Sequence, residues 1–128
     1  MQRSLRFTAL FVLIAASLAC NVFSRRDASP VNTNYSTKFP LPPKVSNFTD
    51  MGNGSINFQT DMSLKDTLSF YRDTFKKEGL TERTVNTSIT GTTFSMVFDG
   101  DPSGQAIVIQ AVDLGGGKTN VNIRYEKV

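Results

Sequence analysis

The sequence predicts an α+β domain, with a mainly antiparallel sheet of about five strands in the order β-α-β-β-β-β and one helix packed on one face. Three observations predict it. Residues 64–78 carry apolar side chains at helical spacing, and the segments on either side alternate apolar and polar residues as half-buried strands do. Turn-forming Gly, Asp and Pro separate the later segments. Residues 45–128 are long enough for a single domain with a modest core.

The first strand is expected at residues 55–61. Ile56 and Phe58 alternate there with Asn57 and Gln59, which places apolar and polar side chains on opposite faces. One face of the sheet should therefore join the core, while the other meets solvent or a partner.

The helix is expected over residues 64–78. Ser63 precedes it as an N-cap, and Asp66 is a weaker form of the capping-box acid. Gly79 suits the left-handed position that closes a helix, with Leu80 folding back onto the last turn. The core side carries four apolar residues at helical spacing, namely Leu64, Leu68, Tyr71 and Phe75.

Every segment after the helix indicates strand or turn. Strands are expected at residues 81–89, 92–99, 105–114 and 120–126, with turns at 99–104 and 115–119. The segment 105–114 is apolar on both faces, which is typical of a central strand. The strand before it places Phe94, Met96 and Phe98 on one face.

Residues 1–19 have the layout of an export signal. Arg3 and Arg6 lead into an uncharged, largely apolar run over residues 7–19. That run fits the roughly 7–15 residues of a signal-peptide core and is shorter than the roughly 20 residues of a membrane-spanning helix. Residues 1–19 are therefore predicted to be a signal peptide.

Small residues lead from the apolar run to Cys20, the only cysteine of the chain. This sequence resembles the lipobox of bacterial lipoproteins, although Leu18 lies one place later than the usual leucine. The resemblance implies that Cys20 is acylated and becomes the N-terminus, and that the protein is anchored on the extracytoplasmic side of the cell membrane or outer membrane. Ser17 and Ala19 also permit ordinary cleavage, which would release a protein with a free thiol.

Residues 20–44 are expected to be the lipidated N-terminus and a tether rich in Ser, Asn and Pro. As a coil, this tether would hold the domain on the order of 25–30 Å from the anchor. Residues near its end are too apolar for a linker and are expected to pack onto the domain, namely Phe39, Leu41, Val45 and Phe48.

The arrangement of residues 39–128 also resembles small domains of bacterial envelope lipoproteins. In those domains a short strand leads to a helix with an FYRD-like sequence, then to a glycine and antiparallel strands. The corresponding residues here are Phe70, Tyr71, Arg72 and Asp73. The resemblance implies the α+β fold and brings no known activity with it.

The charge of the chain does not indicate nucleic-acid binding. The full sequence has 14 basic and 11 acidic residues, a net charge of +3. Residues 45–128 contain 8 basic and 10 acidic residues, hence −2, so the basic excess belongs to the leader and the tether. A nucleic-acid-binding domain carries clustered positive charge on its folded part, and no such partner is expected here.

The sequence contains no histidine, and its single cysteine is assigned to the lipid. This excludes thiolate or imidazole zinc sites and catalysis by Ser-His or Cys-His pairs. No catalytic residue, metal or cofactor is therefore predicted.

Residues 115–119, GGGKT, look like the end of a phosphate-binding loop. Val112 stands where that loop requires its first glycine, and a strand follows instead of a helix. The segment is therefore predicted to be a hairpin turn, and no nucleotide is expected.

Residues 99–104, DGDPSG, copy the opening of a calcium loop, with oxygen ligands at Asp99, Asp101 and Ser103. The twelfth position is Gln110, which cannot supply a bidentate carboxylate. Asp, Pro and Gly are also typical of a β-turn. A turn is predicted, with a weak calcium site as the alternative.

One polar sheet face remains once the apolar faces pack beneath the helix. Val97, Val108 and Val112 are expected along its middle. The polar residues of this face are Asn57, Gln59, Thr93, Ser95, Asn122 and Arg124. Such a surface suits contact with a protein or a glycan. The alternative is that residues 39–48 cover the valines.

These features lead to three hypotheses. The first is a lipid-anchored, non-catalytic binding module of the cell envelope that contacts a protein or glycan through the polar face. The second is a small-ligand carrier with a pocket between helix and sheet, near Phe70, Tyr71 and Phe98. The third is a hydrolase using Asp99 and Asp101, for which so small a domain offers little room.

Overall fold

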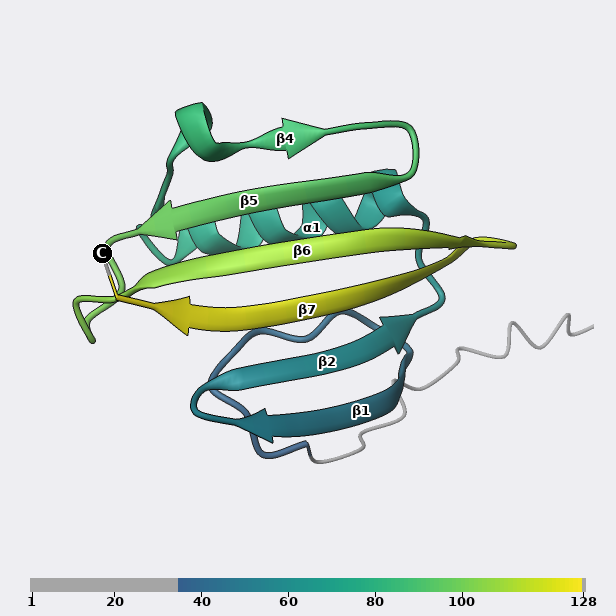
Figure 1. The fold of residues 1–128 in the computed structure, drawn as a ribbon, viewed down its shortest axis with the longest axis horizontal. Helices are drawn as coiled ribbons and strands as arrows, with labels where there is room; N and C mark the ends of the chain where they lie inside the picture. Colours follow the sequence, from purple (N-terminus) through teal and green to yellow (C-terminus); the bar gives the residue numbers. More distant parts are fainter. Residues whose placement is uncertain (1–34, 128) are drawn as a thin grey trace, which may run out of the picture.

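The computed structural model describes residues 35–127, which form one antiparallel sheet with a single α-helix on one face (Figure 1). The strand order is β1-β2-β7-β6-β5-β3, and β4 also pairs with β5. The elements are β1 (Val45–Gly52), β2 (Ser55–Thr60), α1 (Leu64–Lys77), β3 (Thr81–Glu82), the 3-10 helix η1 (Thr84–Asn86), β4 (Ser88–Ile89), β5 (Thr93–Asp99), β6 (Ala106–Gly115) and β7 (Lys118–Glu126). The predicted α+β class is confirmed, but the sheet has seven strands instead of five.

The first additional strand is β1, which the sequence pattern did not predict because its apolar residues do not alternate regularly. Asn47 and Phe48 together lie opposite Phe58 of β2, so the strand contains a β-bulge. Asn47 has the left-handed φ of 50° within it. Because of the bulge, the core-facing residues Val45 and Phe48 are three positions apart, and the two-residue alternation of a strand is lost.

The second difference lies in residues 81–89, which form two short strands instead of one. At the break, the Arg83 N–H still donates to the Val97 carbonyl (2.7 Å), while the Arg83 side chain forms an ion pair with Asp99. The chain then leaves the sheet in η1, where Val85 is 89% exposed. An interrupted edge of this kind resists pairing with a foreign strand.

The predicted signals at both ends of α1 are confirmed. Ser63 Oγ accepts a hydrogen bond from the Asp66 N–H (3.1 Å) and donates one to the Asp66 carboxylate (2.8 Å). After the last turn, Gly79 has a φ of 85° and the Leu80 N–H donates to the Phe75 carbonyl (2.9 Å). These contacts satisfy backbone groups that a helix end leaves without partners.

The hydrophobic core lies between α1 and the sheet. The ring centroids of Phe75 in α1 and Phe98 in β5 are 4.9 Å apart, which joins the two layers. The sheet contributes Ile56, Phe58, Phe94, Met96, Phe98, Ile107, Ile109, Ala111, Val121 and Ile123. Strand β6 lies inside the sheet, as its apolar residues on both faces predict.

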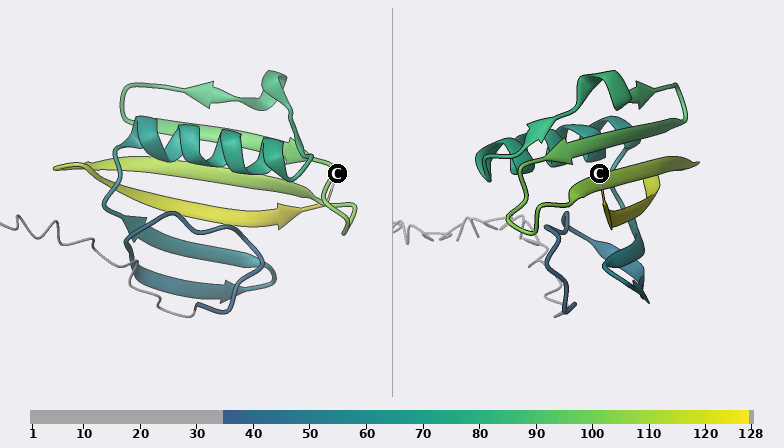
Figure 2. Two further views of the ribbon diagram at one scale, coloured as in Figure 1. Left: turned by 180° about the vertical axis from the view of Figure 1, so that it is seen from behind. Right: turned by 60° about the vertical axis from the view of Figure 1, so that its left-hand side comes forward.

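Residues 35–44, which we call the N-terminal strap, pack on the same face of the sheet as α1 (Figure 2). In the left view of Figure 2, which is seen from the helix side, the strap passes in front of β1 and β2, beside the region that the helix covers. Phe39 is 5% exposed within the core, and the Tyr71 hydroxyl donates to the Pro40 carbonyl (3.3 Å). The expected packing of this segment onto the domain is therefore confirmed.

The opposite face, which carries Gln59, Asn122 and Val112, is called the open face here. Within residues 35–127 no element crosses it, as both figures show. Because the strap packs on the helix side, the alternative in which residues 39–48 cover the valines is wrong.

No helix in the described part of the chain is long and apolar enough to cross a membrane.

Candidate functional site

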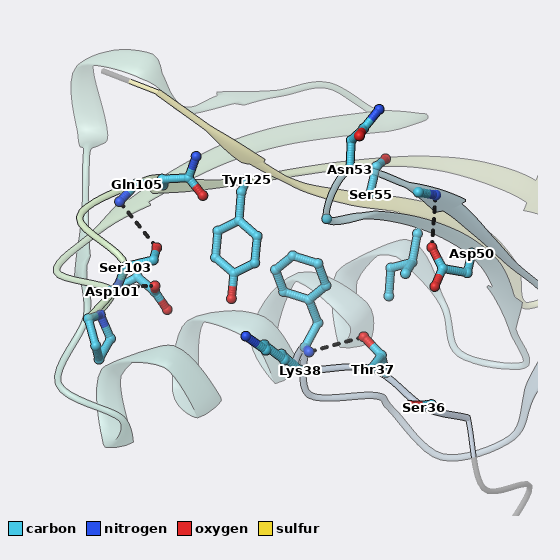
Figure 3. A pocket seen from close by; sticks show the side chains of 15 residues that line it. Ser36, Thr37, Lys38, Asp50, Asn53, Ser55, Asp101, Ser103, Gln105 and Tyr125 are labelled. Atoms are coloured by element: carbon cyan, nitrogen blue, oxygen red, sulfur yellow. Dashed lines mark hydrogen bonds between the residues drawn. The ribbon is translucent and has the colours of Figure 1, made fainter.

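A groove of about 1040 Å³ lies at the end of the sheet where β1 turns into β2 and β5 turns into β6 (Figure 3). We call it the end groove. Its walls come from segments that are distant in the sequence. They are residues 36–39 of the strap, the first turn within residues 50–56, and the second turn within residues 101–105. Tyr125 near the end of β7 completes the lining.

The first turn closes against Tyr125 because of its glycines. Gly52, Asn53 and Gly54 have positive φ values of 76°, 52° and 72°, a conformation that Gly and Asn adopt at little cost. At Gly54 there is also no room for a side chain, because a Cβ would lie 2.8 Å from Cδ2 of Tyr125. The Gly54 carbonyl accepts a hydrogen bond from the Tyr125 N–H (3.1 Å), which fixes the turn against the strand.

Tyr125 stands in the middle of the end groove, with its hydroxyl directed between the strap and the second turn (Figure 3). Its ring centroid lies 4.7 Å from that of Phe39, with the planes tilted by 36°. Burial raises the pKa of Tyr125, and the negative charges of Asp101 and Glu78 raise it further. The hydroxyl therefore stays protonated at neutral pH and can donate as well as accept a hydrogen bond.

Two carboxylates of the groove are fixed by the backbone of their own turns. Asp50 Oδ1 accepts the Gly52 N–H (2.8 Å), and Asp101 Oδ2 accepts the Ser103 N–H (2.8 Å). A carboxylate has acceptor sites on both oxygens, so each group can also accept a hydrogen bond from a ligand. Lys38 of the strap also lines the groove (Figure 3).

The lining of the groove combines an apolar floor with polar walls. The partly exposed Tyr125 ring supplies apolar surface, whereas Phe39 and Ile56 also line the groove but are only 5% and 3% exposed. The polar side chains are Ser36, Thr37, Lys38, Asp50, Asn53, Ser55, Asp101, Ser103 and Gln105. Among residues 35–127, no three His, Cys, Asp or Glu side chains are grouped so that they could hold a metal ion. The chemistry that this lining supplies is hydrogen bonding to a ligand over an apolar floor.

Of the polar residues that line the end groove, the sequence singled out only Asp101 and Ser103, as candidate calcium ligands, and it did not predict the groove. The Asn-Gly pair at 53–54 is a hairpin signal that indicates the first turn, and with it β1. No pattern in the sequence places that turn beside Asp101 or Tyr125, because the three segments meet only through the pairing of the sheet.

The open face brings the predicted contact residues together. Cross-strand pairing aligns Val97, Val108 and Arg124 in one row. The next two rows contain Ser95, Gln110, Asn122 and Asn57, and then Thr93, Val112, Asn120 and Gln59.

The three valines do not form the exposed stripe that the sequence predicts. Val108 is 5% exposed, whereas Val112 is 45% exposed. Arg124 lies opposite Val108 and donates to Gln110 Oε1 (2.8 Å), so its side chain extends over the middle of the face. Apolar surface is instead exposed near the β6–β7 turn, where Leu114 is 50% exposed.

The charged residues of the open face pair with one another. Both carboxylate oxygens of Asp99 accept hydrogen bonds from Arg83, and this holds the pKa of Asp99 below its usual range. Arg124 pairs with Glu126 at 2.9 Å. The open face is therefore polar with little net charge.

The calcium and hydrolase hypotheses combine the carboxylates of Asp99 and Asp101, which have different partners in the structure. The Asp99 carboxylate is bound by Arg83, whereas the Asp101 carboxylate lies in the end groove and accepts the Ser103 N–H. The predicted turn is present, because the Gly104 N–H donates to the Asp101 carbonyl (2.9 Å). The GGGKT segment likewise forms the hairpin between β6 and β7.

The place expected for a carrier pocket, between helix and sheet, is filled with side chains. Tyr71 is 0% exposed and Phe98 is 2% exposed. The rings of Phe70 and Tyr71 pack edge to face at 5.0 Å. A ligand therefore has no space at this position, and the end groove lies elsewhere.

The predicted signal peptide and Cys20 fall within residues 1–34, outside the described residues.

The chain matches no known protein-family model, and no curated protein or solved structure is significantly similar to it.

Proposed function

We propose that this protein is a lipid-anchored, extracytoplasmic, non-catalytic binding domain of the cell envelope that contacts a protein partner through its open face. The anchor is supported by the signal-like residues 1–19 and by the single cysteine, Cys20. The contact is supported by one observation above all. Helix α1 and the strap pack against the same face of the sheet, and no element of residues 35–127 crosses the other.

A protein partner suits the open face better than a glycan does. In the paired rows of β2, β5, β6 and β7, this face presents no aromatic ring on which a sugar could stack. Val112 and Leu114 expose apolar surface beside amide side chains that both donate and accept hydrogen bonds. Protein interfaces combine an apolar centre with a polar rim in this way.

Photo-crosslinking in an expressing bacterium tests the contact. A photo-reactive residue at Val112 or Gln59 should capture one and the same protein. The same residue at Lys65 or Lys76, both exposed on α1, is the matched control and should not capture it. Equal capture from both faces, or capture from the helix alone, would contradict the proposal.

A charge at the centre of the contact gives a second test. Val112→Asp should abolish crosslinking from Gln59, because an unpaired carboxylate in an apolar contact is costly. Val112 is 45% exposed, so the substitution should leave the far-UV circular dichroism and the melting temperature nearly unchanged. Crosslinking that survives this substitution would place the contact elsewhere.

The anchor is tested by the intact mass of the protein from the membrane fraction. The expected species begins at Cys20 and carries a diacylglyceryl group, with or without one further acyl chain. An unmodified chain that begins at Cys20 and is found in the medium would contradict the lipid anchor.

A further inference from the structure

We propose that the end groove is a second binding site, separate from the open face, and that its ligand is a neutral oligosaccharide. The groove lies on the helix side of the sheet, because Phe39, Ile56 and Tyr125 belong to or pack against the core on that side. A ligand here and a protein partner on the open face would occupy opposite sides of the same sheet.

The first argument is the aromatic floor. The Tyr125 ring is partly exposed in the groove, and the buried Phe39 ring packs against it with centroids 4.7 Å apart and holds it in place. The C–H groups on one side of a sugar ring form an apolar surface that packs on aromatic rings, and the open face lacks this feature. Gly54 contributes as well, because its missing side chain lets the turn approach the edge of the Tyr125 ring.

The second argument is the fixed orientation of the hydrogen-bonding groups. Asp50 and Asp101 each use one carboxylate oxygen to bind a backbone N–H two residues further along, at 2.8 Å. Figure 3 shows the two groups on opposite sides of Tyr125, both in the lining of the groove. Acceptors that are already oriented lose little entropy when they bind hydroxyl groups, and hydrogen bonds to a charged acceptor are strong.

The third argument is the character of the remaining lining. The side chains of Asn53 and Gln105 carry amides that donate and accept, and several serine and threonine hydroxyls surround them. Lys38 of the strap is the one basic residue of this lining. With one ammonium against two carboxylates, this lining disfavours an anionic ligand, and its many amide and hydroxyl groups favour a neutral, hydroxyl-rich one.

The groove also has the size and the construction of a ligand site. Its volume of about 1040 Å³ is near the upper end of the range for such sites, so it has room for several linked sugar rings. The strap forms one wall, and Phe39 ties that wall to the core. The wall is therefore present only when the strap is packed on the sheet.

Titration of the ¹⁵N-labelled full chain with maltotriose and with triacetylchitotriose tests the proposal. At least one sugar should shift the backbone amide signals of Gly54, Ser103 and Tyr125. Asp50→Asn and Asp101→Asn should each weaken binding about tenfold, because a neutral amide oxygen replaces a charged acceptor. An asparagine still accepts the backbone N–H, so both variants should keep the wild-type melting temperature to within a few degrees.

Asp113→Asn is the matched control. Asp113 accepts the Gly115 N–H at 2.8 Å in the same kind of turn, but it lies at the opposite end of the sheet. Its substitution should leave sugar binding unchanged. The proposal is overturned if neither sugar shifts these signals at about 10 mM, if trilysine shifts them instead, or if all three variants weaken binding equally.

Discussion

Replacement of Phe39 by alanine tests whether the strap belongs to the folded domain or is only the end of a tether. Phe39 is 5% exposed, and its ring packs on Tyr125 at 4.7 Å. Removal of a buried phenylalanine ring typically costs about 3–5 kcal/mol of unfolding free energy. Small domains have a total of roughly 5–15 kcal/mol, so Phe39→Ala should remove about a fifth or more of the stability.

Urea unfolding followed by far-UV circular dichroism measures this loss, since the chain has no tryptophan to report on unfolding. The midpoint should fall with little change in slope, and the melting temperature should fall by about 15 °C or more. Val85→Ala is the control, because Val85 is 89% exposed and its truncation should cost less than about 0.5 kcal/mol. A loss below about 1 kcal/mol for Phe39→Ala would refute the assignment of the strap to the domain.

Three further predictions concern the strap, the first turn and the link between helix and edge strand. A chain of residues 45–128 should unfold at a lower temperature than one of residues 35–128, because it loses the strap and the contacts of Phe39. Gly54→Ala should destabilise the protein by about 1 kcal/mol more than Gly116→Ala, as measured by urea unfolding. Both glycines have positive φ, but only at Gly54 does a Cβ approach another side chain. Hydrogen bonding to Arg72 lowers the pKa of Glu82, so this pair contributes stability above the unfolded glutamate pKa of about 4.3 and loses it as the pH falls through the folded pKa. Because the pair is partly exposed, Glu82→Gln should cost about 1 kcal/mol or less at neutral pH. In urea titrations at decreasing pH, the stabilities of wild type and variant should converge as the pH falls through the folded pKa.

The parts of the fold that depend on neighbouring residues were predictable from the sequence. Ser63 and Gly79 delimit α1 through contacts within a few residues, so their chemistry suffices to place both helix ends. Strands β5, β6 and β7 show their alternation because each is regular over most of its length. The expected export signal and the lipobox-like residues before Cys20 are likewise linear patterns in the sequence.

The features that the sequence did not predict depend on contacts between distant segments. The bulge at Asn47 shifts the apolar positions of β1 to a spacing of three, so the sequence pattern does not indicate a strand there. Only the pairing with β2 defines β1 as a strand. The expected stripe of valines fails for a similar reason, because Arg124 of the neighbouring strand lies beside Val108.

The end groove is the clearest feature that depends on contacts between distant segments and not on local sequence. Asp50, Asp101 and Tyr125 lie in separate segments, and nothing in their local sequence relates one to another. They meet because β2 pairs with β7 and β7 with β6, which brings two turns and the end of a strand to one edge. Linear patterns thus determined the fold class, the helix and the expected anchor. The register of the sheet and the packing of the strap determined the site, since both are properties of long-range pairing that no short stretch of sequence encodes.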